Sequence, residues 1–76
     1  MQITRKQYDY LQGFYAHCYA VYHEKSDADF GFWASQLDEA NVPWCVQNSV
    51  AVTAEDKGSM SLYLSTHLAN RGVSIH

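Results

Sequence analysis

The sequence has little charge and few basic residues. Of its 76 residues 17% are charged, below the usual ~25%, and 5 Lys and Arg stand against 8 Asp and Glu, for a net charge of −3. No basic stripe is present that would neutralise a phosphate backbone, so we expect no nucleic-acid partner. The carboxylates are also too few to form the dense acidic face of a DNA mimic.

Long apolar runs and cysteine motifs are absent as well. No stretch approaches the ~18 apolar residues of a membrane span, and residues 1–7 lack the apolar segment of a secretory signal. The two cysteines, Cys18 and Cys45, form neither a Cys-x-x-Cys motif nor a disulfide framework. We therefore expect one cytoplasmic domain over residues 1–76, with both thiols reduced and buried.

No pattern for catalysis or metal binding is found. His17 and Cys18 are adjacent and would point apart on a helix, and His23, His67 and His76 supply no second ligand pair with zinc spacing. There is no glycine-rich loop for phosphate or for an oxyanion. The sequence therefore predicts no metal, no cofactor and no enzymatic activity.

Helical periodicity dominates what is present. The chain is 47% apolar, and Tyr8, Leu11 and Tyr15 recur at intervals of three and four residues, with Cys18 and Tyr22 continuing the series. Thr4 and Gln7 match a capping box, with Ile3 before it as a hydrophobic staple, so a helix is predicted over 5–24.

A second helix is predicted over 27–40. Ser26 would cap its start, Asn41 would end it in a left-handed conformation, and Pro43 would prevent its continuation. Its inward face is expected to consist of Phe30, Trp33, Ala34 and Leu37. Phe32 lies some 200° around the helix from Phe30 and cannot be buried with that face.

The third segment, 43–57, is ambiguous. Alternation of Trp44, Val46, Val50 and Val52 favours a strand, but Pro43 and Lys57-Gly58 are typical of helix ends, and we favour the helix. A last helix is expected from Ser59 to Arg71-Gly72, followed by a tail that packs through Val73 and Ile75. The predicted fold is an all-α, compact bundle of about four short helices. The alternative is a small α+β fold with a strand at 44–53.

The second half of the chain is loosely similar to a helix-turn-helix motif. The similarity consists of Ser49-Val50-Ala51, Gly58-Ser59, Leu64-Ser65 and Leu68. In this chain the glycine comes later than in the typical motif, and Lys57 and Arg71 are balanced by Glu55 and Asp56. The resemblance implies a DNA-binding regulator, which we keep as the alternative function.

Our leading hypothesis is a non-enzymatic protein that binds another protein or a larger complex, as an inhibitor or accessory subunit. A phage or mobile-element origin suits this size, and self-association is a further option. Aromatic side chains dominate many interfaces because they add large contact area. We predict Phe32 as the anchor, Gln36 and Glu39 as its polar rim, and Tyr10 and Tyr19 as flanking contacts.

Overall fold

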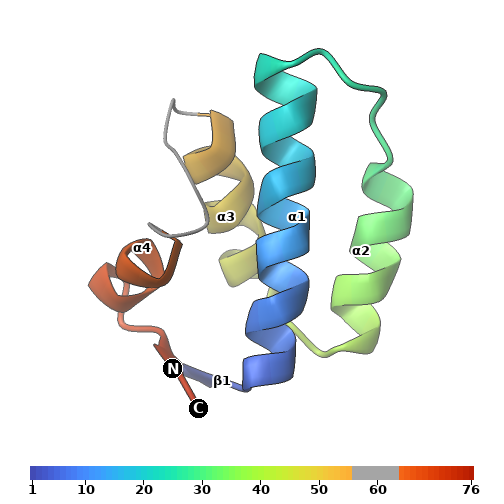
Figure 1. Cartoon of the computed structure of the whole chain (residues 1–76). Coiled ribbons are helices and arrows are strands. Elements are labelled where there is room, and N and C mark those ends of the chain that lie inside the picture. The colour runs from blue at the N-terminus through green and yellow to red at the C-terminus, as the bar shows by residue number, and fades with distance from the viewer. Residues whose placement is uncertain (56–63) are drawn as a thin grey trace.

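The computed structural model describes residues 1–55 and 64–76 and forms an all-α bundle. Figure 1 shows the longest helix, α1 (Arg5–His23), standing between α3 (Trp44–Glu55) and α2 (Phe30–Glu39). A short helix, α4 (Leu64–Asn70), lies at the foot of α3, and a small strand pair joins β1 (Gln2–Ile3) to β2 (Ser74–Ile75). The predicted fold class is confirmed.

The predicted start of α1 is also confirmed. The Thr4 side chain accepts the Gln7 N–H at 3.1 Å, and the Gln7 side chain accepts the Thr4 N–H at 2.7 Å, which completes the capping box. Leu11 and Cys18 on the apolar face of α1 are fully buried. Their spacing of seven residues places them on one side of the helix, where they contact α3 and the chain ends.

The ambiguous third segment is a helix, so the strand at 44–53 does not form. Val46, Val50 and Ala54 repeat every four residues and form the buried face of α3. Trp44 is two residues before Val46 and therefore points elsewhere on a helix, although the two share a face on a strand. The choice between helix and strand thus decided where the tryptophan lies.

The chain ends are joined by a parallel strand pair that the sequence did not predict. The Ser74 N–H donates to the Met1 carbonyl and the His76 N–H to the Ile3 carbonyl, both at 2.9 Å. Gly72, with φ +78°, ends the last helix as expected, and Val73 and Ile75 pack on the core. The expected helix start at Ser59 and stop at Gly58 lie outside the described residues.

The second helix begins later than predicted, at Phe30 and not at residue 27, and Ser26 does not cap it. Asp29 occupies the N-cap position without a side-chain hydrogen bond; its backbone N–H donates to His17 Nε2 on α1 at 3.0 Å. The neighbouring helix therefore supplies the partner that Ser26 was expected to supply. The C-terminal prediction is confirmed, since Asn41 has φ +61°.

Three contacts with α1 hold α2 in place along its length. His17 binds its N-terminus, and Gln7 Nε2 donates to the carbonyls of Ala40 and Asn41 at its C-terminus, at 2.8 and 3.2 Å. Between them Trp33 lies over Gly13, where a Cβ atom would stand 2.5 Å from the indole ring. The small residue in α1 permits this close approach of α2.

No helix in the described part of the chain is both long and apolar enough to cross a membrane.

Candidate functional site: an apolar groove between three helices

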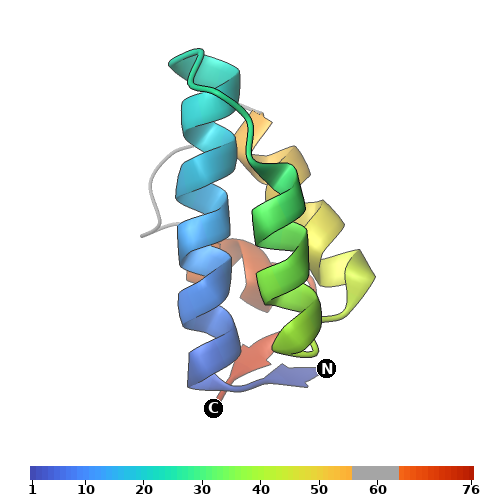
Figure 2. The same cartoon turned by 90° about the vertical axis from the view of Figure 1, so that its right-hand side faces the viewer.

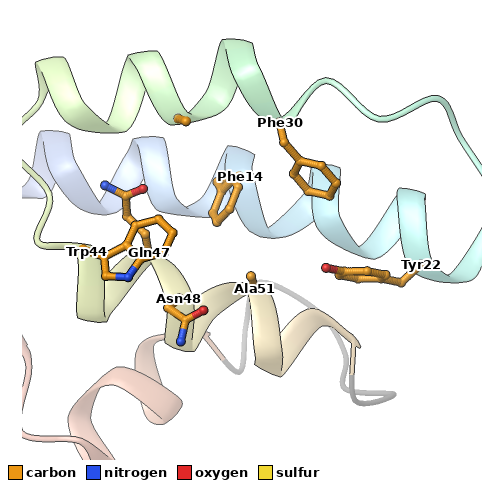
Figure 3. Close-up of a pocket in the computed structure, with 8 residues that line it drawn as sticks. Phe14, Tyr22, Phe30, Trp44, Gln47, Asn48 and Ala51 are labelled. Carbon is orange, nitrogen blue, oxygen red and sulfur yellow. The ribbon is translucent and has the colours of Figure 1, made fainter.

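An open groove of about 260 Å³ runs between α2 and α3, with α1 as its floor (Figure 3). It forms because α2 and α3 each pack on α1 but share little direct contact with each other. The lining residues come from all three helices: Phe14, Tyr22, Phe30, Ala34, Trp44, Gln47, Asn48 and Ala51.

Three of the aromatic side chains that line the groove are exposed to solvent. Phe14 forms the floor and is buried, whereas Phe30 is 38% exposed, Tyr22 43% and Trp44 73%. A Trp side chain this exposed costs free energy in water, because its large apolar surface is left unburied. The groove therefore presents an apolar surface that the monomer does not cover.

Two amide side chains, Gln47 and Asn48, line the groove, and the Gln47 amide has its donors engaged within the fold. Its side-chain Nε2 donates to the Val42 carbonyl at 3.0 Å and to Asp38 Oδ1 at 3.2 Å, and the residue is buried. These bonds connect α3 to the C-terminal part of α2 and close one end of the groove. Among the described residues no buried side-chain nitrogen or oxygen lacks a partner. The groove thus favours apolar over polar ligands.

The opposite end of the groove is formed by Tyr22 and Phe30, whose ring centroids are 6.4 Å apart. The His17 ring on α1 packs edge-on against Phe30, with ring centroids 5.4 Å apart. The pKa of the Tyr22 hydroxyl is raised above its usual value by partial burial and, more weakly, by the neighbouring Cys18 thiol and the Glu55 carboxylate. Glu55, the last residue of α3, is therefore close enough to influence this end.

The predicted anchor, Phe32, lies on a different surface. It is 51% exposed and packs edge-on against Trp33, with ring centroids 5.5 Å apart, on the side of α2 away from Phe30. Gln36 and Glu39 follow it at helical spacing, so the three predicted residues share one outer face of α2. Gln36 is half-buried and Glu39 is exposed.

The two tyrosines that were predicted to flank Phe32 do not lie together beside the outer face of α2. Positions 10 and 19 are about two and a half turns apart at 3.6 residues per turn, so Tyr10 and Tyr19 lie on opposite sides of α1. Both are half-buried against the core, and Tyr19 stacks on Tyr15 and His23. The five predicted residues therefore form no single surface.

Sequence reasoning missed Trp44, Phe30 and Tyr22 as surface residues. Phe30 and Ala34 were expected to point inward with Leu37, but Leu37 alone of these three is buried. The inward prediction fails because no helix packs on this side of α2 within the described chain. Trp44 could have been found from its 200° offset from Val46, once the segment is read as a helix.

A cluster of Thr53, His67 and Arg71 between α3 and α4 brings a hydroxyl close to a histidine, as in sites for nucleophilic catalysis. Thr53 Oγ1 donates its proton to the Ser49 carbonyl at 2.8 Å, and Arg71 Nε donates to His67 Nε2 at 3.1 Å. Thr53 Oγ1 also lies 2.9 Å from His67 Nε2 and 3.2 Å from His67 Nδ1. Because the hydroxyl gives its proton to the Ser49 carbonyl, the histidine is not placed as a base for that hydroxyl.

The cysteines differ in environment. Cys18 is buried as expected, and burial raises the pKa of its thiol to about 11. The expectation of burial is wrong for Cys45, which is exposed on α3 one residue after Trp44, on a face that the core does not need. Within residues 1–55 and 64–76 no three His, Cys, Asp or Glu side chains are grouped closely enough to hold a metal ion.

Comparison with protein-family models, curated proteins and solved structures gave no match to this chain.

Proposed function

We propose that this protein is a non-enzymatic binding module, an inhibitor or accessory subunit that holds a segment of a larger cytoplasmic protein in the groove between α2 and α3. The observation that carries the proposal is Trp44, which is 73% exposed in the lining of a mostly apolar groove. Tryptophan is the residue type most enriched among those that dominate binding energy.

The size of the groove supports a protein partner over a small molecule. Sites that enclose drug-sized ligands usually have volumes of ~300–1,000 Å³ and bury most of the ligand. This groove has about 260 Å³, just below that range, and it is partly open to solvent. It suits a few apolar side chains that project from a larger surface.

The proposal is tested by alanine substitution in a binding assay with the native host proteome. Trp44→Ala should abolish retention of the partner while the melting temperature stays nearly unchanged, because the ring is mostly in water already. Retained proteins are identified by mass spectrometry, and each is then produced and titrated against the wild type and the variant.

Two matched variants locate the binding surface. Val52→Ala truncates another exposed apolar residue of α3, at 53% exposure, outside the groove, and should leave binding intact. Phe32→Ala tests the outer face of α2. Loss of binding in Phe32→Ala with full binding in Trp44→Ala would overturn the groove and restore the surface of Phe32, Gln36 and Glu39.

The helix-turn-helix alternative gains no specific support. The turn on which the resemblance depends lies in residues 56–63, outside the described part of the chain. The last described helix and its C-terminal turn carry one formal positive charge, at Arg71. Retention of duplex DNA at physiological salt with a dissociation constant below about 1 μM would reverse this ranking.

A further inference from the structure

The residues that line the groove are spaced in a way that fits a bound helix. On α3 the lining residues Trp44, Gln47 and Ala51 are spaced i, i+3 and i+7, and on α2 Phe30 and Ala34 are spaced i and i+4 (Figure 3). Lining residues at helical spacing on both walls mean that the groove runs along the helix axes. The lining stretch of α3, from Trp44 to Ala51, spans about 11 Å at 1.5 Å per residue. A guest helix would therefore lay about two turns in the groove, with apolar residues at the same spacing.

The segment that builds the walls is strongly acidic. Between positions 24 and 55 there are six carboxylates and one basic side chain, a local net charge of −5 in a chain whose total is −3. The acidic residues are Glu24, Asp27, Asp29, Asp38, Glu39 and Glu55, and the basic residue is Lys25. Within the described residues none of these groups forms a salt bridge.

Three of these carboxylates lie next to groove-lining residues, and they are divided between the two ends of the groove. Asp38 accepts a hydrogen bond from Gln47 at one end. At the other end Glu55 follows the lining residue Ala51 by one helical turn on the same side of α3, and Asp29 immediately precedes Phe30. The apolar groove is therefore bordered at each end by negative charge that has no cationic partner in the described chain.

We propose that the groove binds an amphipathic helix of a partner protein whose apolar stripe is flanked by lysine or arginine. The apolar stripe covers Trp44, Phe30 and Tyr22, and the basic flanks meet Asp38 at one end and Glu55 at the other. A second copy of this chain fits less well, because its own groove-bearing segment carries the same negative charge. This inference rests on the proposed function and adds the chemistry of the partner.

The test uses two synthetic helical peptides of about 15 residues, the length at which isolated helices begin to form. Both carry the same leucine stripe at i, i+3, i+4 and i+7, and their polar positions are all lysine in one and all glutamate in the other. In calorimetric titrations at low salt, the full-length protein should bind the lysine peptide at least tenfold more tightly than the glutamate peptide. Added salt should reduce the difference, because it screens exposed charges.

Matched variants separate groove binding from general attraction to an acidic protein. Trp44→Ala keeps every charge and should weaken lysine-peptide binding at least tenfold. The double variant Asp38→Asn and Glu55→Gln should lower the preference for the lysine peptide several-fold, and the amide oxygen introduced at position 38 can still accept the hydrogen bond from Gln47. Asp9→Asn removes one charge from the far face of α1 and should change little.

Each contrary outcome has one meaning. Equal binding of the two peptides, or lysine-peptide binding unchanged by Trp44→Ala, overturns the basic-helix partner. A concentration-dependent dimer in sedimentation that Trp44→Ala abolishes would identify a second copy as the occupant instead. If the peptide preference fails while Trp44→Ala still abolishes capture of the host partner, the proposed function stands without this partner chemistry.

Discussion

The two sides of α1 are packed in different ways. On the side of α3, Leu11 and Cys18 meet Val50, Leu64 and Leu68, and all five are fully buried. On the other side, α2 lies along α1 (Figure 2). Its contact with α1 depends on Trp33, Leu37 and hydrogen bonds at each end of the helix, and Phe30 and Phe32 remain exposed. One side supplies the stability of a small domain, and the other supplies an uncovered surface.

The difference follows from what each helix presents to its neighbour. The buried face of α3 consists of small and β-branched residues that fit closely under α1. In contrast, α2 presents a bulky indole that rests on Gly13, and hydrogen bonds from α1 hold the two ends of the helix. Phe30 and Ala34 are consequently left facing the space between α2 and α3. The groove exists because α2 packs along α1 and is joined to α3 only near its C-terminus, where Gln47 donates to Asp38.

The largest change in the free energy of unfolding is expected for a substitution on the closely packed side of α1, which faces α3. Leu11→Ala removes a fully buried side chain and should lower the free energy of unfolding by about 3 kcal/mol or more, because a cavity remains where the leucine was. In a small domain this loss consumes much of the total stability. Urea denaturation followed by circular dichroism measures it. A loss below about 1 kcal/mol would contradict the division into two sides.

The next effect tests how α2 is held, with two glycines as a matched pair. Gly13→Ala would place a Cβ atom 2.5 Å from the Trp33 ring, so the ring and α2 must shift, at an expected cost of about 1–3 kcal/mol. Gly31 lies in the first turn of α2 with open space around it, and Gly31→Ala should raise stability by no more than about 0.5 kcal/mol, because helix propensity has less effect at a helix end than in its middle.

Both glycine variants are measured by denaturation and by the near-ultraviolet dichroism of the tryptophans. A Gly13→Ala variant with wild-type stability and an unchanged tryptophan signal would show that Trp33 is not the anchor of α2.

A smaller effect is expected for the outer face of α2. Phe32 is 51% exposed, so Phe32→Ala should change the free energy of unfolding by less than about 1 kcal/mol, against ~3–5 kcal/mol for a core phenylalanine. Thermal denaturation decides between the two values. A collapsed melting temperature would mean that this ring belongs to the closely packed part and is no interaction residue.

The smallest effect concerns pH. Partial burial and then the neighbouring Arg71 charge lower the pKa of His67 below its usual 6.5. As the pH falls below about 6.5 the unfolded chain takes up a proton before the folded chain does, so stability decreases until the lower folded pKa is passed. His67→Gln should flatten the stability profile between pH 7 and pH 5. His76→Gln, at the exposed chain end, is the control, and equal slopes in all three proteins would contradict the assignment.

The sequence alone determined the helices whose signals are local. The Thr4–Gln7 capping box, the left-handed residues Asn41 and Gly72, and the spacing of Leu11 and Cys18 act over a few residues, so each was predictable. The start of α2 was not, because Asp29 is held by His17, a partner from another helix. The strand pair of the two chain ends was missed for the same reason, since it joins residues from opposite ends of the sequence.

Only the tertiary structure decided which aromatic side chains stay in water. Phe32 is the exception. Its exposure was predictable because its position opposite Phe30 follows from the geometry of a single helix. Phe30 was predicted to point inward, because an apolar face in the sequence indicates that something must cover it but not whether the chain itself does so. Here α2 and α3 each pack on α1 and share little contact with each other, and the surface between them stays open.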